Sequence, residues 1–159
     1  MKLYHGSSVE VAAPKVSHAR KNLDFGRGFY LTSFQSQAER WAKRKAVRYG
    51  GEPIVNIYEL SEDLSQFKTL HFKDNDKEWV EFVCDGRRGG QEYADYDIII
   101  GAVANDKVYA AVDMYFKGLW DIDATLKALK FYELNDQICL VSQRAIDELL
   151  VFVGSYEVR

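Results

Sequence analysis

The hydrophobic and polar positions along the chain predict short strands near both ends and helices between them. Runs of β-branched, aromatic and other apolar residues that are too short for a helix are expected to form strands. These runs are residues 2–4, the end of 24–32, 54–60, 70–72, 96–101, 137–141 and 151–158. Because strands and helices do not alternate regularly, the pattern favours an α+β fold over a regular strand–helix–strand repeat.

Apolar residues at spacings of three and four predict helices in the intervening segments. The first helix is expected at about 37–49, with Ser36 as its N-cap and Gly50–Gly51 as its stop. Asp76 is expected to cap the second helix in the same way. The remaining helices are expected at 108–116, 123–130 and 143–150.

Length and composition predict a single domain that spans residues 1–159. Hydrophobic residues make up 47% of the chain and aromatic residues 14%, which is enough to fill a core. The segment after Met1 has no apolar run, and no later stretch approaches the roughly 18 apolar residues of a membrane span. We therefore expect a soluble, cytoplasmic protein with no membrane partner.

Charge and cysteine content give little indication of a partner. The net charge of −3 is small, and the basic run at residues 40–48 falls on a predicted helix, where it is more often a solvated face than a nucleic-acid site. Cys84 and Cys139 lie in apolar segments, where buried free thiols are the commoner state. We expect neither a disulfide nor a zinc site, because the histidines and cysteines form no ligand cluster in the sequence.

Three segments carry side chains that together suit a flat nucleotide ligand. They are His5-Gly6-Ser7, the run Gly28-Phe29-Tyr30-Leu31-Thr32, and Gln137 at the head of a late strand. A histidine beside a glycine combines an imidazole donor with backbone that a ligand can approach closely. Tyr30 and Trp41 can enclose a nicotinamide ring between them. Taken singly, His5 is more often a structural histidine, Tyr30 a core aromatic, and the glycines part of a hairpin or bulge.

These residues resemble the His-Tyr-Glu branch of the ADP-ribosyltransferase superfamily, the branch that contains the poly(ADP-ribose) polymerases. The chain is similar over nearly its whole length to DUF3990, a family of small bacterial proteins of unknown function that has been grouped with those transferases. The segments that carry the resemblance are Leu3–Ser7, Asp24–Thr32, Gln37-Ala38, Trp41-Ala42, Asp97–Gly101, Ala104–Asp106 and Gln137-Ile138.

The resemblance implies an ADP-ribosyltransferase-like split β-sheet core with peripheral helices, and a cleft that holds NAD as a co-substrate. His5 would hold the adenosine ribose, while the Gly6 backbone and the Ser7 hydroxyl would bind the nicotinamide amide. Tyr30 and Trp41 would stack on the nicotinamide, although the second aromatic residue of the branch is typically a tyrosine. The implied cofactor-binding residues are Gly6, Ser7, Gly28, Phe29 and Trp41.

The chain departs from the branch at the third catalytic position, where Gln137 replaces a glutamate. An anion at this position stabilises the positive charge that develops on the ribose during glycosidic cleavage. Glutamine keeps a hydrogen bond without the charge, so we expect slower cleavage, and single transfer rather than chain elongation. Glu81 is the fallback carboxylate, although a helix position at the surface is its more common role. Asn105 and Asp106 follow a buried strand, where they fit either a functional loop or a helix cap.

The function implied by the resemblance is mono-ADP-ribosyl transfer from NAD to a protein, a nucleic acid or a small molecule, with His5, Tyr30 and Gln137 as catalytic residues. The resemblance also implies a toxin of a toxin–antitoxin or phage-defence system, with an antitoxin protein as a partner. An NAD glycohydrolase and a non-catalytic nucleotide- or protein-binding module remain alternatives. All three readings require these residues to meet at one groove, and we expect His5 and Tyr30 to lie in it rather than at a packing centre.

Overall fold

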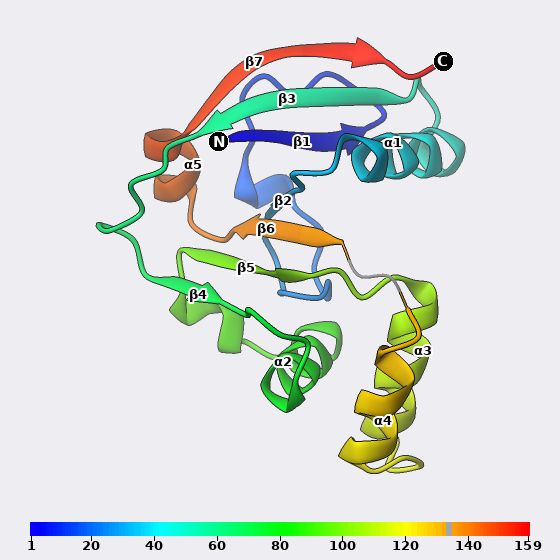
Figure 1. Cartoon of the computed structure of the whole chain (residues 1–159). Helices are drawn as coiled ribbons and strands as arrows, with labels where there is room; N and C mark the ends of the chain where they lie inside the picture. The colour runs from blue at the N-terminus through cyan, green and yellow to red at the C-terminus, as the bar shows by residue number, and fades with distance from the viewer. Residues whose placement is uncertain (133–134) are drawn as a thin grey trace.

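Two β-sheets form the centre of the computed structural model, which describes residues 1–132 and 135–159 (Figure 1). The first sheet has the order β1-β3-β7, with all pairs antiparallel. Its strands are β1 (Lys2–Ser7), β3 (Ile54–Leu60) and β7 (Leu150–Glu157).

The second sheet has the order β2-β6-β5-β4. Its strands are β2 (Phe29–Leu31), β4 (Thr69–His71), β5 (Ile98–Ala102) and β6 (Asp136–Leu140), and the β4–β5 pair is parallel while the others are antiparallel. The two sheets are joined through Tyr4 and Thr32, whose backbone amides and carbonyls exchange hydrogen bonds of 2.9 and 3.0 Å. The fold is therefore α+β, as the sequence predicts.

Helices pack around this pair of sheets. The helix α1 (Gln35–Tyr49) packs on β1 and β3, and α5 (Gln143–Leu149) leads directly into β7. The helix α2 (Lys77–Arg87) lies beside the second sheet, while α3 (Asp106–Phe116) and α4 (Ile122–Leu129) pack on each other below it (Figure 1). Short 3₁₀ turns occur at η1 (Val16–His18) and η2 (Glu92–Asp95). Within the described ranges, no helix combines the length and apolar character required to cross a bilayer.

The hydrophobic core is divided by these layers. One cluster, which includes Leu3, Tyr58 and Leu140, draws on both sheets and fills the space between them. A second cluster surrounds Trp79 and packs α2 and α3 on the other face of the second sheet. Polar side chains near the junction of the two sheets, among them His5, Asp24 and Gln137, lie outside these two clusters and line a cleft.

Several local predictions are confirmed, and several elements differ from their predicted boundaries, of which the first helix and the first strand lie beside the cleft. Asp76 caps α2 by accepting from the Trp79 amide at 3.1 Å, and Cys84 and Cys139 are buried free thiols. The first helix, however, begins at Gln35 and not at Ser36–Gln37. The Asp136 carboxylate accepts from the Ser33 amide at 2.9 Å and fixes the chain just before the helix. The helix therefore begins two residues before the predicted start at Gln37.

The first strand is also longer than predicted, because it extends to Ser7 and not to Tyr4. Pairing with β3 holds the extra residues, and His5 lies opposite Asn56 in the ladder. His5 and Ser7 are therefore strand residues whose positions are set by the sheet rather than by a loop.

Candidate functional site

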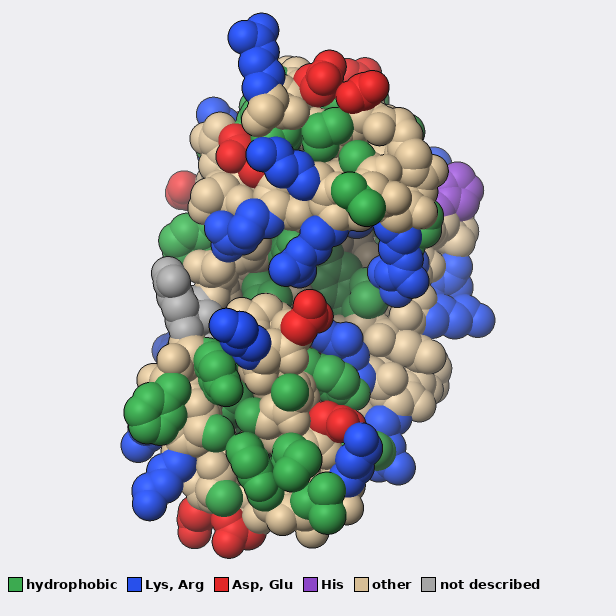
Figure 2. Space-filling model, turned by 90° about the vertical axis from the view of Figure 1, so that its right-hand side faces the viewer, with side chains coloured by type: hydrophobic (Ala, Val, Ile, Leu, Met, Phe, Trp, Pro, Cys, Tyr) green, Lys and Arg blue, Asp and Glu red, His purple; other side chains and the backbone are tan. Residues whose placement is uncertain are grey.

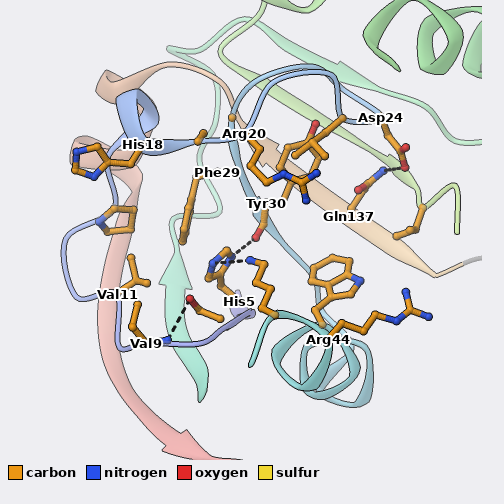
Figure 3. Close-up of a pocket in the computed structure, with 18 of the residues that line it drawn as sticks. His5, Val9, Val11, His18, Arg20, Asp24, Phe29, Tyr30, Arg44 and Gln137 are labelled. Atoms are coloured by element: carbon orange, nitrogen blue, oxygen red, sulfur yellow. Dashed lines mark hydrogen bonds between the residues drawn. The ribbon is translucent and has the colours of Figure 1, made fainter. Parts of the chain in front are cut away.

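A cleft of about 730 Å³ opens where the two sheets separate, and Figure 3 shows His5, Tyr30 and Gln137 around it. Its walls come from β1, β2, the start of β6, α1, the 9–24 loop and the segment that leads into α3. Seven of the eight predicted site residues line it, namely His5, Ser7, Gly28, Phe29, Tyr30, Trp41 and Gln137. Three strands that are distant in sequence, together with α1, therefore bring these residues to one opening, and its volume is typical of a small-molecule site.

The cleft begins at a fork between β1 and β2. The two strands pair at Tyr4 and Thr32 and then diverge, so Gly6 and Tyr30 lie on opposite sides of the fork. Because backbone groups alternate in direction along a strand, the amide and carbonyl of Gly6 point to the same side as those of Tyr4. The Gly6 backbone thus faces the fork although Gly6 is not itself a wall of the cleft.

Gly6 is required for the packing of α1 as well as for access. A Cβ atom at Gly6 would lie 2.1 Å from the Ala38 carbonyl oxygen and 2.6 Å from the Ala42 amide nitrogen. Both are backbone atoms of α1, which cannot move aside cheaply. The absence of a side chain therefore lets α1 approach β1 and place Trp41 and Lys45, one helical turn apart, on the cleft wall.

His5 is a neutral imidazole held in one tautomer. Its Nδ1 lies 2.6 Å from the Tyr30 carbonyl oxygen, which can only accept, so Nδ1 carries the proton and Nε2 has the lone pair. Burial first, and then the nearby Lys45 ammonium, lowers the pKa of His5 to about 3. The ring also packs on Phe29, with centroids 4.3 Å apart. At neutral pH His5 therefore offers the cleft an uncharged acceptor.

Lys45 occupies the fork between the strands. Its Nζ donates to the Gly6 carbonyl oxygen at 2.7 Å and lies 3.5 Å from His5 Nε2. Burial, with a smaller effect of Arg20, lowers the pKa of Lys45 to about 8. An ammonium that loses water in this way is stabilised by any anion that enters the cleft.

Tyr30 lines the cleft and also holds the preceding loop through its hydroxyl. Its hydroxyl donates to the Gly26 carbonyl at 2.6 Å and accepts from the Phe25 amide at 2.9 Å, and burial raises its pKa. Its ring packs against the cluster around Trp79. The expectation that His5 and Tyr30 lie in the cleft rather than at a packing centre is therefore wrong in part, because the buried His5 and the half-buried Tyr30 also pack and form hydrogen bonds within the fold.

The remaining predicted binding residues differ in exposure. Phe29 is 8% exposed and belongs to the cluster between the sheets, so it supports His5 more than it contacts the cleft. Gly28 allows its strand to pass β6, since a Cβ there would lie 2.3 Å from Cys139 Sγ. Ser7 Oγ accepts from the Val9 amide at 3.4 Å. Trp41 is partly exposed on the cleft wall.

Gln137 is bound to the ion pair between the buried Asp24 and the half-buried Arg87, which the sequence analysis did not single out. Its Nε2 donates to Asp24 Oδ2 at 2.9 Å and to the Ala102 carbonyl at 3.1 Å. The other oxygen of Asp24 accepts from Arg87 Nε at 2.6 Å, and the Ala104 amide donates to Oδ2 at 2.8 Å. Asp24 is 5% exposed. A single acid among glycines and aromatics was the available sequence signal, but its partner lies 63 residues away.

The alternative carboxylate, Glu81, lies outside the cleft. It is exposed, accepts from the Tyr115 hydroxyl at 3.0 Å and pairs with Lys77 at 3.8 Å. Asn105 caps α3 by accepting from the Lys107 and Val108 amides, and both Asn105 and Asp106 line the cleft. The helix-cap interpretation of Asn105 is thus confirmed, at a position on the cleft wall.

The cleft is positively charged, whereas the chain as a whole carries −3. Five cationic side chains and three anionic ones line it: Lys15, Arg20, Arg44, Lys45 and Arg87, with Glu10, Asp24 and Asp106. Figure 2 shows Lys and Arg side chains around the hollow. Within residues 1–132 and 135–159, Arg87 is the one cation of this set that forms an ion pair, with Asp24. The cleft therefore suits an anionic ligand.

Fold and site define an α+β protein with a cationic cleft at the junction of two sheets. The family model of DUF3990, whose description is a protein of unknown function, matches residues 1–152. The chain belongs to this family. Comparison with curated proteins found no significant match, and comparison with solved structures found none either.

Proposed function

We propose that the protein is an NAD-dependent mono-ADP-ribosyltransferase with an ADP-ribosyltransferase-like core. The observation that carries the proposal is the meeting of His5, Tyr30 and Gln137 in one cleft of about 730 Å³. These residues come from three different strands and follow the order of the catalytic residues in the branch the sequence resembles. His5 and Tyr30 also match in type, whereas Gln137 stands where that branch has a glutamate. The split of β1 from β2 also agrees with the divided sheet that the resemblance implies.

The nicotinamide lies at the fork, between Tyr30 and Trp41. There the Gly6 backbone offers the carboxamide a donor and an acceptor, and the carboxamide N–H replaces Lys45 as the donor to the Gly6 carbonyl. The freed ammonium, with Arg20 and Arg44, faces the diphosphate. This arrangement accounts for buried positive charge beside a neutral His5, which otherwise costs stability.

Gln137 accepts a hydrogen bond from a ribose hydroxyl as the bond to nicotinamide breaks. The reaction cleaves the bond between ribose C1′ and the nicotinamide nitrogen, releases nicotinamide, and joins C1′ to a nucleophile of the acceptor, which loses a proton. The positive charge that develops on the ribose is stabilised by acceptors directed at it. A neutral amide favours a single slow transfer.

The direct test is titration of the chain with NAD together with a nicotinamide-release assay. We expect binding in the micromolar to millimolar range and release that is lost in Gln137→Ala while binding persists. Gln91→Ala, an exposed glutamine outside the cleft, is the matched control. If the titration detects no binding at millimolar NAD, the proposed function is wrong.

The cationic wall provides a second, independent test. Arg44 lines the cleft, whereas Arg40 lies one turn earlier on α1 and is exposed outside it. Arg44→Gln is expected to weaken NAD binding about fivefold or more at low salt, with a smaller effect at high salt. Arg40→Gln should leave the Kd unchanged. Equal effects of the two variants would argue against diphosphate recognition at this wall.

The acceptor is identified by incubating cell lysate with labelled NAD and the protein, followed by mass analysis. Label in macromolecules supports transfer, including the toxin role that the resemblance implies. Label in free ADP-ribose alone would assign the site to an NAD glycohydrolase. Binding of NAD without any release over hours would assign it to a non-catalytic module.

A further inference from the structure

The amide of Gln137 has one orientation that satisfies its surroundings. Two acceptors, Asp24 Oδ2 and the Ala102 carbonyl, lie 2.9 and 3.1 Å from one end of the side chain. An amide nitrogen has two N–H donors and matches them, whereas the amide oxygen would repel both. Nε2 is therefore directed inward, and Oε1 is left on the cleft side, where no donor from the described residues binds it.

Asp24 is fixed more rigidly than a single hydrogen bond to Gln137 would require. Arg87 holds Oδ1 at 2.6 Å, and the Ala104 amide holds Oδ2 at 2.8 Å. Arg87 is fixed in turn, because it donates to the Ala104 carbonyl at 3.1 Å and lies 4.2 Å from the Tyr109 ring centroid. The ion pair is thus a preorganised dipole with its negative end on the Gln137 amide.

We propose that Asp24 is a positioning residue for the transfer reaction: it clamps and polarises Gln137, so that the amide oxygen serves where related transferases use a carboxylate. The inference rests on the proposed function and deepens it. A carboxylate that accepts from an amide nitrogen draws the amide towards its charge-separated form, which increases the negative charge on Oε1. The site therefore still contains a carboxylate, that of Asp24, which acts on the ribose through the Gln137 amide and not by direct contact.

The same geometry explains why glutamate does not suit position 137. A carboxylate there would place an oxygen against Asp24 Oδ2 and the Ala102 carbonyl, with no donor between them. Two carboxylates in contact do not both ionise, so one would take up a proton. The glutamine is therefore the residue that fits this buried pair, and not a sign of lost chemistry.

The first experiment compares Asp24→Asn with the parent protein. Asparagine is nearly isosteric with aspartate, but it replaces the charged carboxylate that binds Gln137 with a neutral amide. We expect kcat for nicotinamide release to fall about ten- to a hundred-fold, the range for a hydrogen bond to a charged group, while KM for NAD changes less than about threefold. Asp113→Asn is the matched control, because it breaks an ion pair with Lys117 outside the cleft. An unchanged kcat in a folded Asp24→Asn protein overturns the inference.

The second experiment uses Gln137→Glu and does not depend on folding of the Asp24 variant. We expect slower nicotinamide release than in the parent, and a free energy of unfolding that falls as pH rises above about 4.3, the unfolded pKa of glutamate. The sign follows because contact with Asp24 raises the folded pKa of the introduced carboxyl group. Gln91→Glu, at an exposed position, should follow the pH profile of the parent. Faster release with the pH profile of the parent overturns the inference.

A third readout separates this inference from the proposed function. In NMR spectra the side-chain amide protons of Gln137 should be shifted downfield and protected from exchange in the parent, and this should be lost in Asp24→Asn. If the parent releases no nicotinamide, the proposed function fails and Asp24 has no role in turnover, whereas the NMR and pH results still report whether the clamp exists. If the parent releases nicotinamide but its Gln137 side-chain amide protons are neither shifted downfield nor protected from exchange, the role of Asp24 is overturned and the proposed function stands.

Discussion

Lys45 Nζ lies 2.7 Å from the Gly6 carbonyl oxygen, where β1 ceases to pair with β2. The contact joins the α1 helix to the strand edge that faces the cleft. It also explains how a half-buried lysine is held without a carboxylate partner among the described residues. A ligand that uses the Gly6 backbone must first move this ammonium.

Replacing Lys45 with an apolar residue is expected to stabilise the fold and to weaken NAD binding. Burial lowers the pKa of Lys45 to about 8, below the 10.5 of an ordinary lysine, so the folded state binds fewer protons and stability rises with pH between these values. Lys45→Met should therefore raise the free energy of unfolding at pH 7 by about 1–3 kcal/mol and remove that rise. It should weaken NAD binding at the same time. Denaturant titration across pH and calorimetry measure both effects, with the exposed Lys43→Met as the control.

Gly6→Ala is expected to destabilise the fold because the new methyl group would overlap the α1 backbone. The nearest atom, the Ala38 carbonyl oxygen, lies 2.1 Å from the position of that Cβ. Overpacking against backbone should cost about 3 kcal/mol or more in the free energy of unfolding. Gly154→Ala is the matched control in β7, since no atom lies within 4 Å of its Cβ position. Similar losses for the two variants would contradict the close approach of α1.

His5 should make the protein sensitive to acid. Its pKa is lowered from 6.5 to about 3, mainly by burial, so the unfolded state takes up a proton that the folded state refuses. The stability it contributes is complete above pH 6.5 and is lost as pH falls towards 3. His5→Gln keeps a donor for the Tyr30 carbonyl and should flatten this loss, which is on the order of 5 kcal/mol. Unfolding titrations at several pH values test this, and His18→Gln, which is exposed, should change nothing.

Tyr30→Phe should separate the structural role of Tyr30 from its place on the cleft wall. The change removes the bonds to the Gly26 carbonyl and the Phe25 amide but keeps the ring. We expect a loss of about 1–3 kcal/mol in stability, because two buried backbone groups lose their partner, with NAD affinity largely retained. Thermal unfolding and NAD titration of the same variant measure both quantities. The exposed Tyr49→Phe serves as the control, and a lost affinity with unchanged stability would reverse the assignment.

The local elements could be predicted because they depend on neighbouring residues. The capping carboxylate of Asp76, the strand at Ile54–Leu60 and the helix that ends at Tyr49 follow from short-range patterns, and the structure contains all three. The start of the first helix could not be predicted in the same way. It depends on Asp136, which is brought to Ser33 by the second sheet and lies 103 residues away.

The residue types at the cleft were also readable from the sequence, through His5, Tyr30, Trp41 and Gln137. Their environments were not. The tautomer of His5 depends on a contact with Tyr30, 25 residues away, and the position of Gln137 depends on Asp24, 113 residues away. The Tyr30 hydroxyl bonds locally, to Gly26, but only after the chain has folded back on itself.

The amino-acid sequence by itself determined the α+β class and most elements through the order of apolar and polar residues, and it indicated the family through its motifs, since periodicity and motif are properties of a linear chain. The tertiary structure alone decided that β1 and β2 separate beyond Tyr4, that a lysine fills the fork, and that a buried ion pair orients the glutamine. The physical reason is that burial, charge and hydrogen-bond partners belong to positions in space, and no residue carries them before the chain has folded.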